Sequence, residues 1–201
     1  MATIFSILIL ILSVVVHEVA HGWSAYFLGD STAKLAGRLT LNPISHLDPM
    51  GSFFVPLLTY SLGGFIFGWA KPVPYNPYNL RVGRAGPALV GLAGPVANIF
   101  LAICFSIIIR LTLGVVPMAF IELAAMVVVI NFGLAIFNLI PVPPLDGSKI
   151  LFALIPYRYH SVEEILNRYQ LFFAILAITI IAPLILPIVG FLFHLTTGLT
   201  F

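Results

Sequence analysis

Three side chains that can bind a metal or carry a proton lie within five residues near the start of the chain. They are His17, Glu18 and His21, in the pattern HExxH. On a helix, positions i and i+4 share one face, so both imidazoles can point at a single metal ion. Catalytic zinc typically takes three protein ligands and leaves one position for water, whose pKa falls to about 7. The pattern therefore predicts His17 and His21 as zinc ligands and Glu18 as the general base of a hydrolase.

The surroundings of this motif strengthen the prediction. The motif lies in an apolar segment, residues 4–28, which is long enough to cross a hydrocarbon core of about 30 Å. In a soluble protein, HExxH also arises by chance or on a solvated helix surface. Inside a membrane helix a central acid costs about 2.5 kcal/mol or more, so that alternative is much weaker. Metal coordination accounts for all three side chains together.

A third ligand is needed, and the other acids and histidines supply the candidates: Asp30, His46, Asp48, Glu122, Asp146, His160, Glu163, Glu164 and His194. Most of them lie in loops or near the ends of predicted helices. Asp146 differs because it follows an apolar helix through the sequence NLIPVPPLDG. The prolines favour an extended chain and Gly147 permits a close backbone approach, so this loop can bring a carboxylate into the helix bundle.

Composition places the whole chain in a bilayer. Of its 201 residues, 61% are hydrophobic and 8% are charged, whereas a soluble domain has about 25% charged residues. The apolar segments recur along the chain, which predicts an all-α, multi-pass membrane protein. Four spans are expected, at residues 4–28, 86–113, 117–140 and 171–195. Pro183 and Pro187 should kink the last one.

A fifth apolar segment, residues 51–70, contains Pro56 and the Gly63-Gly64 pair and either spans the membrane or re-enters it. Lys and Arg collect on cytoplasmic loops, so their count distinguishes the two arrangements. A re-entrant segment leaves Arg110 alone on one side and places eight residues on the other: Lys34, Arg38, Lys71, Arg81, Arg84, Lys149, Arg158 and Arg168. A span divides them six to three. We therefore expect four transmembrane helices plus a re-entrant segment, with both termini outside the cytoplasm.

Length and charge limit the remaining possibilities. No polar stretch reaches the roughly 50 residues of a separate soluble domain, so residues 1–201 are expected to form one domain. The basic residues are scattered through short loops, which argues against a nucleic-acid partner. The one cysteine, Cys104, lies in an apolar run and cannot form a disulfide framework.

Three motifs together resemble those of the site-2 proteases, a family of intramembrane zinc metalloproteases. The first is HExxH at residues 17–21, and the second is Leu145-Asp146-Gly147, preceded by Asn138 and by prolines between positions 141 and 144. The third is GPVAN, from Gly94-Pro95 to Asn98. The stretches GRLTLNPISHLDPMG and GWAKPVPYNP are similar to the short bacterial branch of the family.

The resemblance implies a core of three helices around one Zn²⁺ per chain, with Asp146 as the third ligand. It implies that the substrate is a transmembrane helix of another membrane protein, cut within or near the bilayer, and that the enzyme lies in the plasma membrane of a prokaryote. It carries over further residues as supports of the site or of substrate binding: Asn98, Asn138, Gly94, Pro95 and Gly147. We add His46, from the loop after the first helix, as a candidate. Interhelical hydrogen bonding by the two asparagines and close helix packing at Gly94 are the alternative roles.

A rival function from another class is a metal transporter or channel with a transient zinc site at His17, Glu18 and His21. Transport requires polar groups that continue to both sides of the membrane, and the outer parts of these helices offer few. A purely structural zinc site is a weaker alternative, because such sites usually fill all four ligand positions with protein groups.

Overall fold

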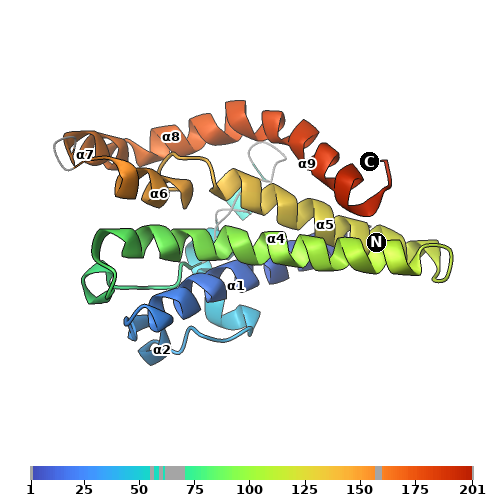
Figure 1. Ribbon diagram of the computed structural model, residues 1–201, viewed down its shortest axis with the longest axis horizontal. Helices are drawn as coiled ribbons and strands as arrows, with labels where there is room; N and C mark the ends of the chain where they lie inside the picture. The colour runs from blue at the N-terminus through green and yellow to red at the C-terminus, as the bar shows by residue number, and fades with distance from the viewer. Residues whose placement is uncertain (1, 55–56, 59–60, 62–70, 157–159, 201) are drawn as a thin grey trace.

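The structure is a computed structural model that describes residues 2–54, 57–58, 61, 71–156 and 160–200. Within these residues the regular elements are all helices. The longest are α1 (Ala2–Phe27), α4 (Gly86–Thr112) and α5 (Met118–Asn138), which Figure 1 shows running side by side. All three are long and apolar enough to cross a membrane, and they confirm the first three predicted spans.

The fourth predicted span is divided into several pieces. The polar helix α7 (His160–Arg168) precedes α8 (Gln170–Leu176), and a bend of 69° separates them. A π-helical turn, Ala177–Ile181, then leads into α9 (Ala182–Thr197). If the bent pair counts as one span, the structure has up to four spans; otherwise it has three.

Of the two prolines expected to kink this region, only Pro183 lies next to a departure from α-helical geometry. Pro183 has no N–H to donate to the carbonyl of Thr179, and the π-helical turn lies at this point. The chain thus departs from α-helical geometry ahead of Pro183, whereas α9 continues through Pro187. The first proline therefore marks the break, and the second is accommodated within a helix.

Helix α4 lies at the centre of the bundle, where it packs against α1, α5 and α9. One apolar core joins α4, α5 and α9, and its buried members are Ala102, Ile109, Ile121, Ala124, Val128, Phe132, Ile185, Val189 and Phe193. Large apolar side chains also point outward, among them Leu8, Phe100 and Phe191. Outward apolar faces of this kind suit a protein whose solvent is lipid.

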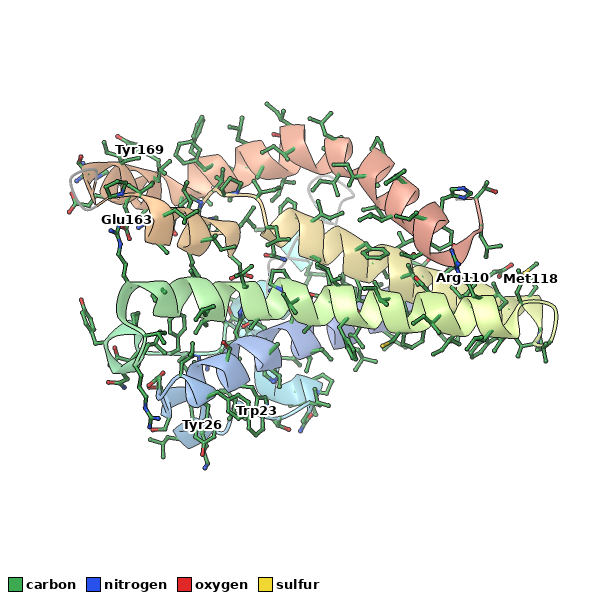
Figure 2. The ribbon with its side chains drawn as sticks, viewed as in Figure 1. Trp23, Tyr26, Arg110, Met118, Glu163 and Tyr169 are labelled. Carbon is green, nitrogen blue, oxygen red and sulfur yellow. The ribbon has the colours of Figure 1, made fainter. Side chains whose placement is uncertain are left out.

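The two ends of the bundle carry different elements. Figure 1 shows both termini at the end where α4 connects to α5, and α2 (Thr32–Leu35), α6 (Gly147–Leu154) and α7 at the opposite end. Figure 2 shows Arg110 near Met118 at the first end, far from Glu163 and Tyr169. This arrangement agrees with the predicted isolation of Arg110 from the other basic residues.

The path of residues 51–70, which we expected to re-enter or span, lies mostly outside the described residues. A hydrogen bond joins the chain before this segment to the chain after it: the Lys71 N–H donates to the His46 carbonyl at 2.9 Å. His46 belongs to a short 3-10 turn, Pro43–His46, in the loop after α1. Lys71 therefore lies on the same side as this loop, as the eight-to-one charge distribution requires.

Two arginines tie α4 to its neighbours at opposite ends of the bundle. The Arg84 guanidinium donates to the carbonyls of Phe152 and Ile155 at the end of α6. The Arg110 guanidinium donates to the carbonyls of Leu195, at 2.8 Å, and Thr196, at 2.6 Å, near the end of α9. A cation suits the C-terminus of a helix, whose last carbonyls lack intrahelical partners.

Asp30 joins the loop after α1 to a segment that follows much later in the chain. Its buried carboxylate accepts hydrogen bonds from the Thr32 hydroxyl, the Asn76 N–H and the Asn79 amide. Burial opposes ionisation of this carboxyl, but the hydrogen bonds outweigh it and hold the pKa of Asp30 below its ordinary value. The ionised side chain thus fixes residues 76–79 beside the end of α1.

Candidate metal centre

The two histidines of HExxH and the aspartate of LDG meet inside the bundle. The Nε2 atoms of His17 and His21 lie 3.0 and 3.1 Å from the same oxygen, Oδ2 of Asp146. All three side chains are buried, and their ligand atoms lie within 4.8 Å of one another. Within the part of the chain that the structure describes, no other group of three histidine, cysteine or acidic residues is placed to hold a metal ion.

Hydrogen bonds on the far side of each imidazole ring fix its orientation. His17 Nδ1 lies 2.5 Å from Oδ1 of Asn98, and His21 Nδ1 lies 2.6 Å from the carbonyl oxygen of Val90. Both partners are acceptors, so each Nδ1 can donate to its partner while the lone pair of Nε2 binds a cation. The rings are thus prepared to bind a cation on the side that faces Asp146.

Asp146 reaches the histidines through a tight connection between α5 and α6. A side chain at Gly147 would collide with the carbonyl oxygens of Leu139 and Ile140, so only glycine allows the start of α6 to come this close to the end of α5. The second oxygen of Asp146, Oδ1, accepts a hydrogen bond from Lys149 Nζ at 2.8 Å. One oxygen is therefore held by Lys149, and the other faces the imidazoles.

Gly94 leaves room between the two imidazoles. A Cβ atom at this position would lie 2.5 Å from Nε2 of His17 and 2.6 Å from Nε2 of His21. A side chain would therefore occupy the space in front of the metal-binding atoms. Pro95, the next residue, is buried within α4. The donor set of two imidazole nitrogens and one carboxylate oxygen, together with the space beside Gly94, fits a catalytic zinc ion.

Glu18 lies beside this group and is half buried. Its Oε2 accepts a hydrogen bond from the backbone N–H of Val73 at 2.8 Å. The carboxylate borders a cavity of about 210 Å³ lined by His17, Glu18, His21, Pro72, Val73, Tyr75, Asn138, Pro144, Asp146 and Lys149. A space large enough for water molecules thus adjoins both the candidate ligands and the candidate base.

The other predicted site residues fall in different places. Asn98 contacts His17 directly, and Asn138, at the end of α5, lines the cavity. His46 is buried elsewhere, in the 3-10 turn after α1, where its Nε2 lies 2.8 Å from the Thr40 carbonyl oxygen. It belongs neither to the metal-binding group nor to the lining of this cavity.

Sequence reasoning missed four contributors to the site: Ser13, Val73, Asn131 and Lys149. Asn131 offered the same signal as Asn98, because an amide in a membrane helix requires partners. Lys149 also had a signal, since it lies three residues after Asp146 at the start of a helix, where side chains i and i+3 meet. Val73 contributes a backbone N–H, which its residue type does not reveal.

Comparison with known proteins shows the family of the chain. A family model described as Peptidase family M50 matches residues 112–177, a range that contains Asp146. The chain is also 38% identical over 159 residues to "Putative zinc metalloprotease YwhC" of Bacillus subtilis (strain 168), an alignment that covers 76% of this chain and 69% of that protein. The chain belongs to peptidase family M50. This confirms the resemblance to the site-2 proteases.

Two more distant relatives are also named as zinc metalloproteases. "Putative zinc metalloprotease Rip2" is 31% identical to the chain over 150 residues in Mycolicibacterium smegmatis (strain ATCC 700084 / mc(2)155). The protein of the same name in Mycobacterium tuberculosis (strain ATCC 25618 / H37Rv) is 32% identical over 150 residues. Each alignment covers 70% of this chain and 53% of the relative. No solved structure matches the chain.

Membership in M50 and the names of these relatives identify the chain as a zinc metalloprotease. Its general function is intramembrane proteolysis, and its apolar helices make it a multi-pass membrane protein. The predictions of enzyme class, zinc cofactor and helical membrane fold are therefore confirmed.

Proposed function

We propose that this chain is an endopeptidase that hydrolyses peptide bonds in or near the transmembrane segments of other membrane proteins. His17, His21 and Asp146 hold the zinc ion, and Glu18 is the general base. The observation that carries the proposal is the meeting of these three ligands and Glu18 around one cavity within a membrane bundle. Residues 1–201 act as a single intramembrane domain, in the plasma membrane of a prokaryote.

Each residue has a defined task. When bound, zinc supplies a Lewis acid that polarises the scissile carbonyl and lowers the pKa of water. Glu18 takes a proton from the attacking water and delivers it to the leaving amine. The Val73 N–H holds the Glu18 carboxylate at the cavity, and Asn138 offers its amide to a substrate from the cavity wall.

The depth of the site supports a substrate cut within one half of the bilayer. At 1.5 Å per residue, His17 lies about 15 Å and His21 about 9 Å from Phe27, the last residue of α1. Phe27 precedes the loops that carry most of the basic residues, so the site lies in the cytoplasmic half of the membrane. A substrate helix must unwind there, because its carbonyls are otherwise engaged in intrahelical hydrogen bonds.

A second cavity adjoins the site on the side of this basic end. It has a volume of about 560 Å³ and shares Tyr75, Pro144 and Lys149 with the cavity beside Glu18. Its wall also includes Arg84 and Glu163, near the starts of α4 and α7. Water and the polar flank of a substrate reach the site by this route.

An apolar cavity on the other side of the site argues against the rival function, metal transport. Toward the N-terminus of α1 lies a cavity of about 300 Å³ whose wall is apolar apart from Ser13 and Asn131. Its other lining residues are Ile9, Leu12, Val15, Val16, Leu41, Leu101, Phe105 and Val127. A permeating cation needs polar groups along its path, and this wall does not provide a series of them.

The proposal is tested with purified protein in liposomes that contain a single-span model substrate, with the cut mapped by mass spectrometry. We expect cleavage in the cytoplasmic half of the substrate helix, and slower cleavage when Gly or Pro near the cut is replaced by Leu. His17→Ala and Asp146→Ala should lose both zinc and cleavage. Cleavage confined to soluble loops, with no effect of the Leu series, would contradict an intramembrane substrate.

A further inference from the structure

A chain of buried polar side chains runs from His17 to two residues that lie away from the metal-binding group. His17 and Ser13 are on α1, Asn98 is on α4 and Asn131 is on α5. Both asparagines are fully buried, and Ser13 is 4% exposed. Polar groups buried to this degree must satisfy one another, so their hydrogen bonds determine how each amide is oriented.

The orientation of Asn131 is set by the backbone of its own helix. Its Nδ2 lies 2.9 Å from the Val127 carbonyl and 2.9 Å from Oγ of Ser13. A carbonyl can only accept, so the amide nitrogen of Asn131 must face it. The amide oxygen, Oδ1, consequently points the other way, toward Asn98.

The orientation of Asn98 follows from that of Asn131. Its Nδ2 donates to Oδ1 of Asn131 at 2.7 Å and to the backbone carbonyl of Ser13 at 3.3 Å. Both of these partners are acceptors, so a flipped Asn98 would bring its oxygen against two others. The amide oxygen of Asn98 is left for Nδ1 of His17, 2.5 Å away.

We propose that Asn131 and Ser13 are positioning residues, which fix the Nδ1–H tautomer of His17 through Asn98 and so keep its Nε2 available to zinc. His21 does not need such a series, because its Nδ1 faces the Val90 carbonyl directly. The two histidines of one motif are therefore oriented by different means. The orientation of the His17 ring depends on the packing of three helices, whereas that of the His21 ring depends on one contact between α1 and α4.

This inference rests on the proposed ligand role of His17, and its consequence for zinc affinity follows from known behaviour of metal sites. Groups that orient a metal-binding histidine typically change metal affinity by about 10-fold to 100-fold when they are removed. Without Oδ1 of Asn131, Asn98 can rotate and present its nitrogen to His17. The ring then favours the Nε2–H tautomer, which has no lone pair for zinc.

The first readout is the hydrogen bond from His17 Nδ1 to Oδ1 of Asn98 in zinc-loaded protein, measured by solid-state NMR in bilayers with ¹⁵N-histidine. The Nδ1–H signal of His17 is the one that His17→Gln removes. We expect one signal, shifted by a strong hydrogen bond, in the wild type and a weaker hydrogen bond with more than one signal in Asn131→Ala. This readout does not depend on proteolysis, so a failure of the proposed enzymatic function would leave it unaffected.

The second readout is zinc affinity, measured by competition with a chelator. Asn131→Ala should bind zinc about tenfold more weakly. Ser13→Ala removes the hydroxyl at the far end of this series of hydrogen bonds and should weaken zinc binding by a smaller factor. Ser13→Thr, which keeps the hydroxyl, should bind zinc as the wild type does. Ser106→Ala is the matched control, because Ser106 is an equally buried hydroxyl of α4 that donates to the Ala102 carbonyl and lies outside the series.

The expected result is a weaker hydrogen bond at His17 Nδ1 together with weaker zinc binding in Asn131→Ala, while the zinc affinity of Ser106→Ala stays within about twofold of the wild type. If Asn131→Ala does not fold, the same pair of changes in Ser13→Ala, reversed in Ser13→Thr, supports the proposal. An unchanged Nδ1–H signal of His17 in the folded Asn131 or Ser13 variants would overturn it, whatever happens to zinc binding.

Discussion

The backbone N–H of Val73 donates a hydrogen bond to the carboxylate of Glu18, 55 positions earlier in the sequence, at 2.8 Å. Glu18 stands on α1, whereas Val73 belongs to the segment that Asp30 fixes beside the end of that helix. The candidate base is thus held by a backbone group of a distant loop. Its position depends on the docking of that loop as well as on the helix that carries it.

Replacing Val73 by proline removes this N–H and should slow cleavage by about tenfold, because a misplaced base loses part of its contribution. Zinc content should not change, since Val73 is not one of the three proposed ligands. Val73→Ala is the control: it shortens the side chain but keeps the N–H. Equal turnover by the two variants would show that this hydrogen bond does not position Glu18.

Alanine at Gly94 should weaken zinc binding by at least about tenfold, because its methyl group would occupy the space in front of both Nε2 atoms. Gly133→Ala on α5 is the matched control, since a Cβ at that position has no neighbour within 4 Å. Zinc content after purification and chelator competition measure the difference. Wild-type affinity in Gly94→Ala would mean that the metal lies elsewhere.

Lys149→Met should also lower zinc affinity, by about tenfold. Lys149 holds Oδ1 of Asp146, and without it the carboxylate is free to rotate away from the histidines. Lys34→Met provides a comparison, because the Lys34 ammonium donates to the exposed Tyr26 hydroxyl at the end of α1. If both variants bind zinc like the wild type, the contact with Asp146 has no role in metal binding.

The first three spans and the proposed ligands could be predicted from the sequence because each has a strong local signal. Long apolar runs indicate membrane helices, and His17 and His21 share a helix face by spacing alone. Asp146, 129 positions after His17, was favoured by the prolines and glycine around it, and the family resemblance then implied its pairing with the histidines. The broken fourth span was harder to predict, because an apolar composition does not reveal where a helix bends.

The orientation of the site residues was least predictable. Which amide faces His17 depends on the packing of α1, α4 and α5, and the Asn131 side chain could equally have joined only its own helix. His46 was a candidate to support the site, and its place in the fold also had no signal in the sequence. Its Nε2 lies against the Thr40 carbonyl in a separate turn.

Asp30→Ala should destabilise the loop that carries Val73, by about 2 kcal/mol at neutral pH, because the donors from Thr32, Asn76 and Asn79 lose their shared acceptor. The pKa of Asp30 is lowered in the folded protein, so its contribution is complete above its ordinary pKa of 3.8 and is lost as the pH falls through the lower folded value. Thermal unfolding in detergent should show a difference in stability between wild type and Asp30→Ala at pH 7 that shrinks in acid.

The control is Asn42→Ala, which removes one exposed hydrogen bond, donated by the Ile44 N–H. A difference that grows on acidification would contradict this sign.

The most direct test of the proposed mechanism compares wild type and Glu18→Gln in the cleavage of a transmembrane substrate, with zinc measured in both proteins. Glutamine can still accept the Val73 hydrogen bond but cannot take a proton from water. We predict that Glu18→Gln keeps its zinc and loses cleavage by a factor on the order of 10² to 10⁴. Turnover within about twofold of the wild type, with zinc bound, would contradict the role of Glu18 as general base.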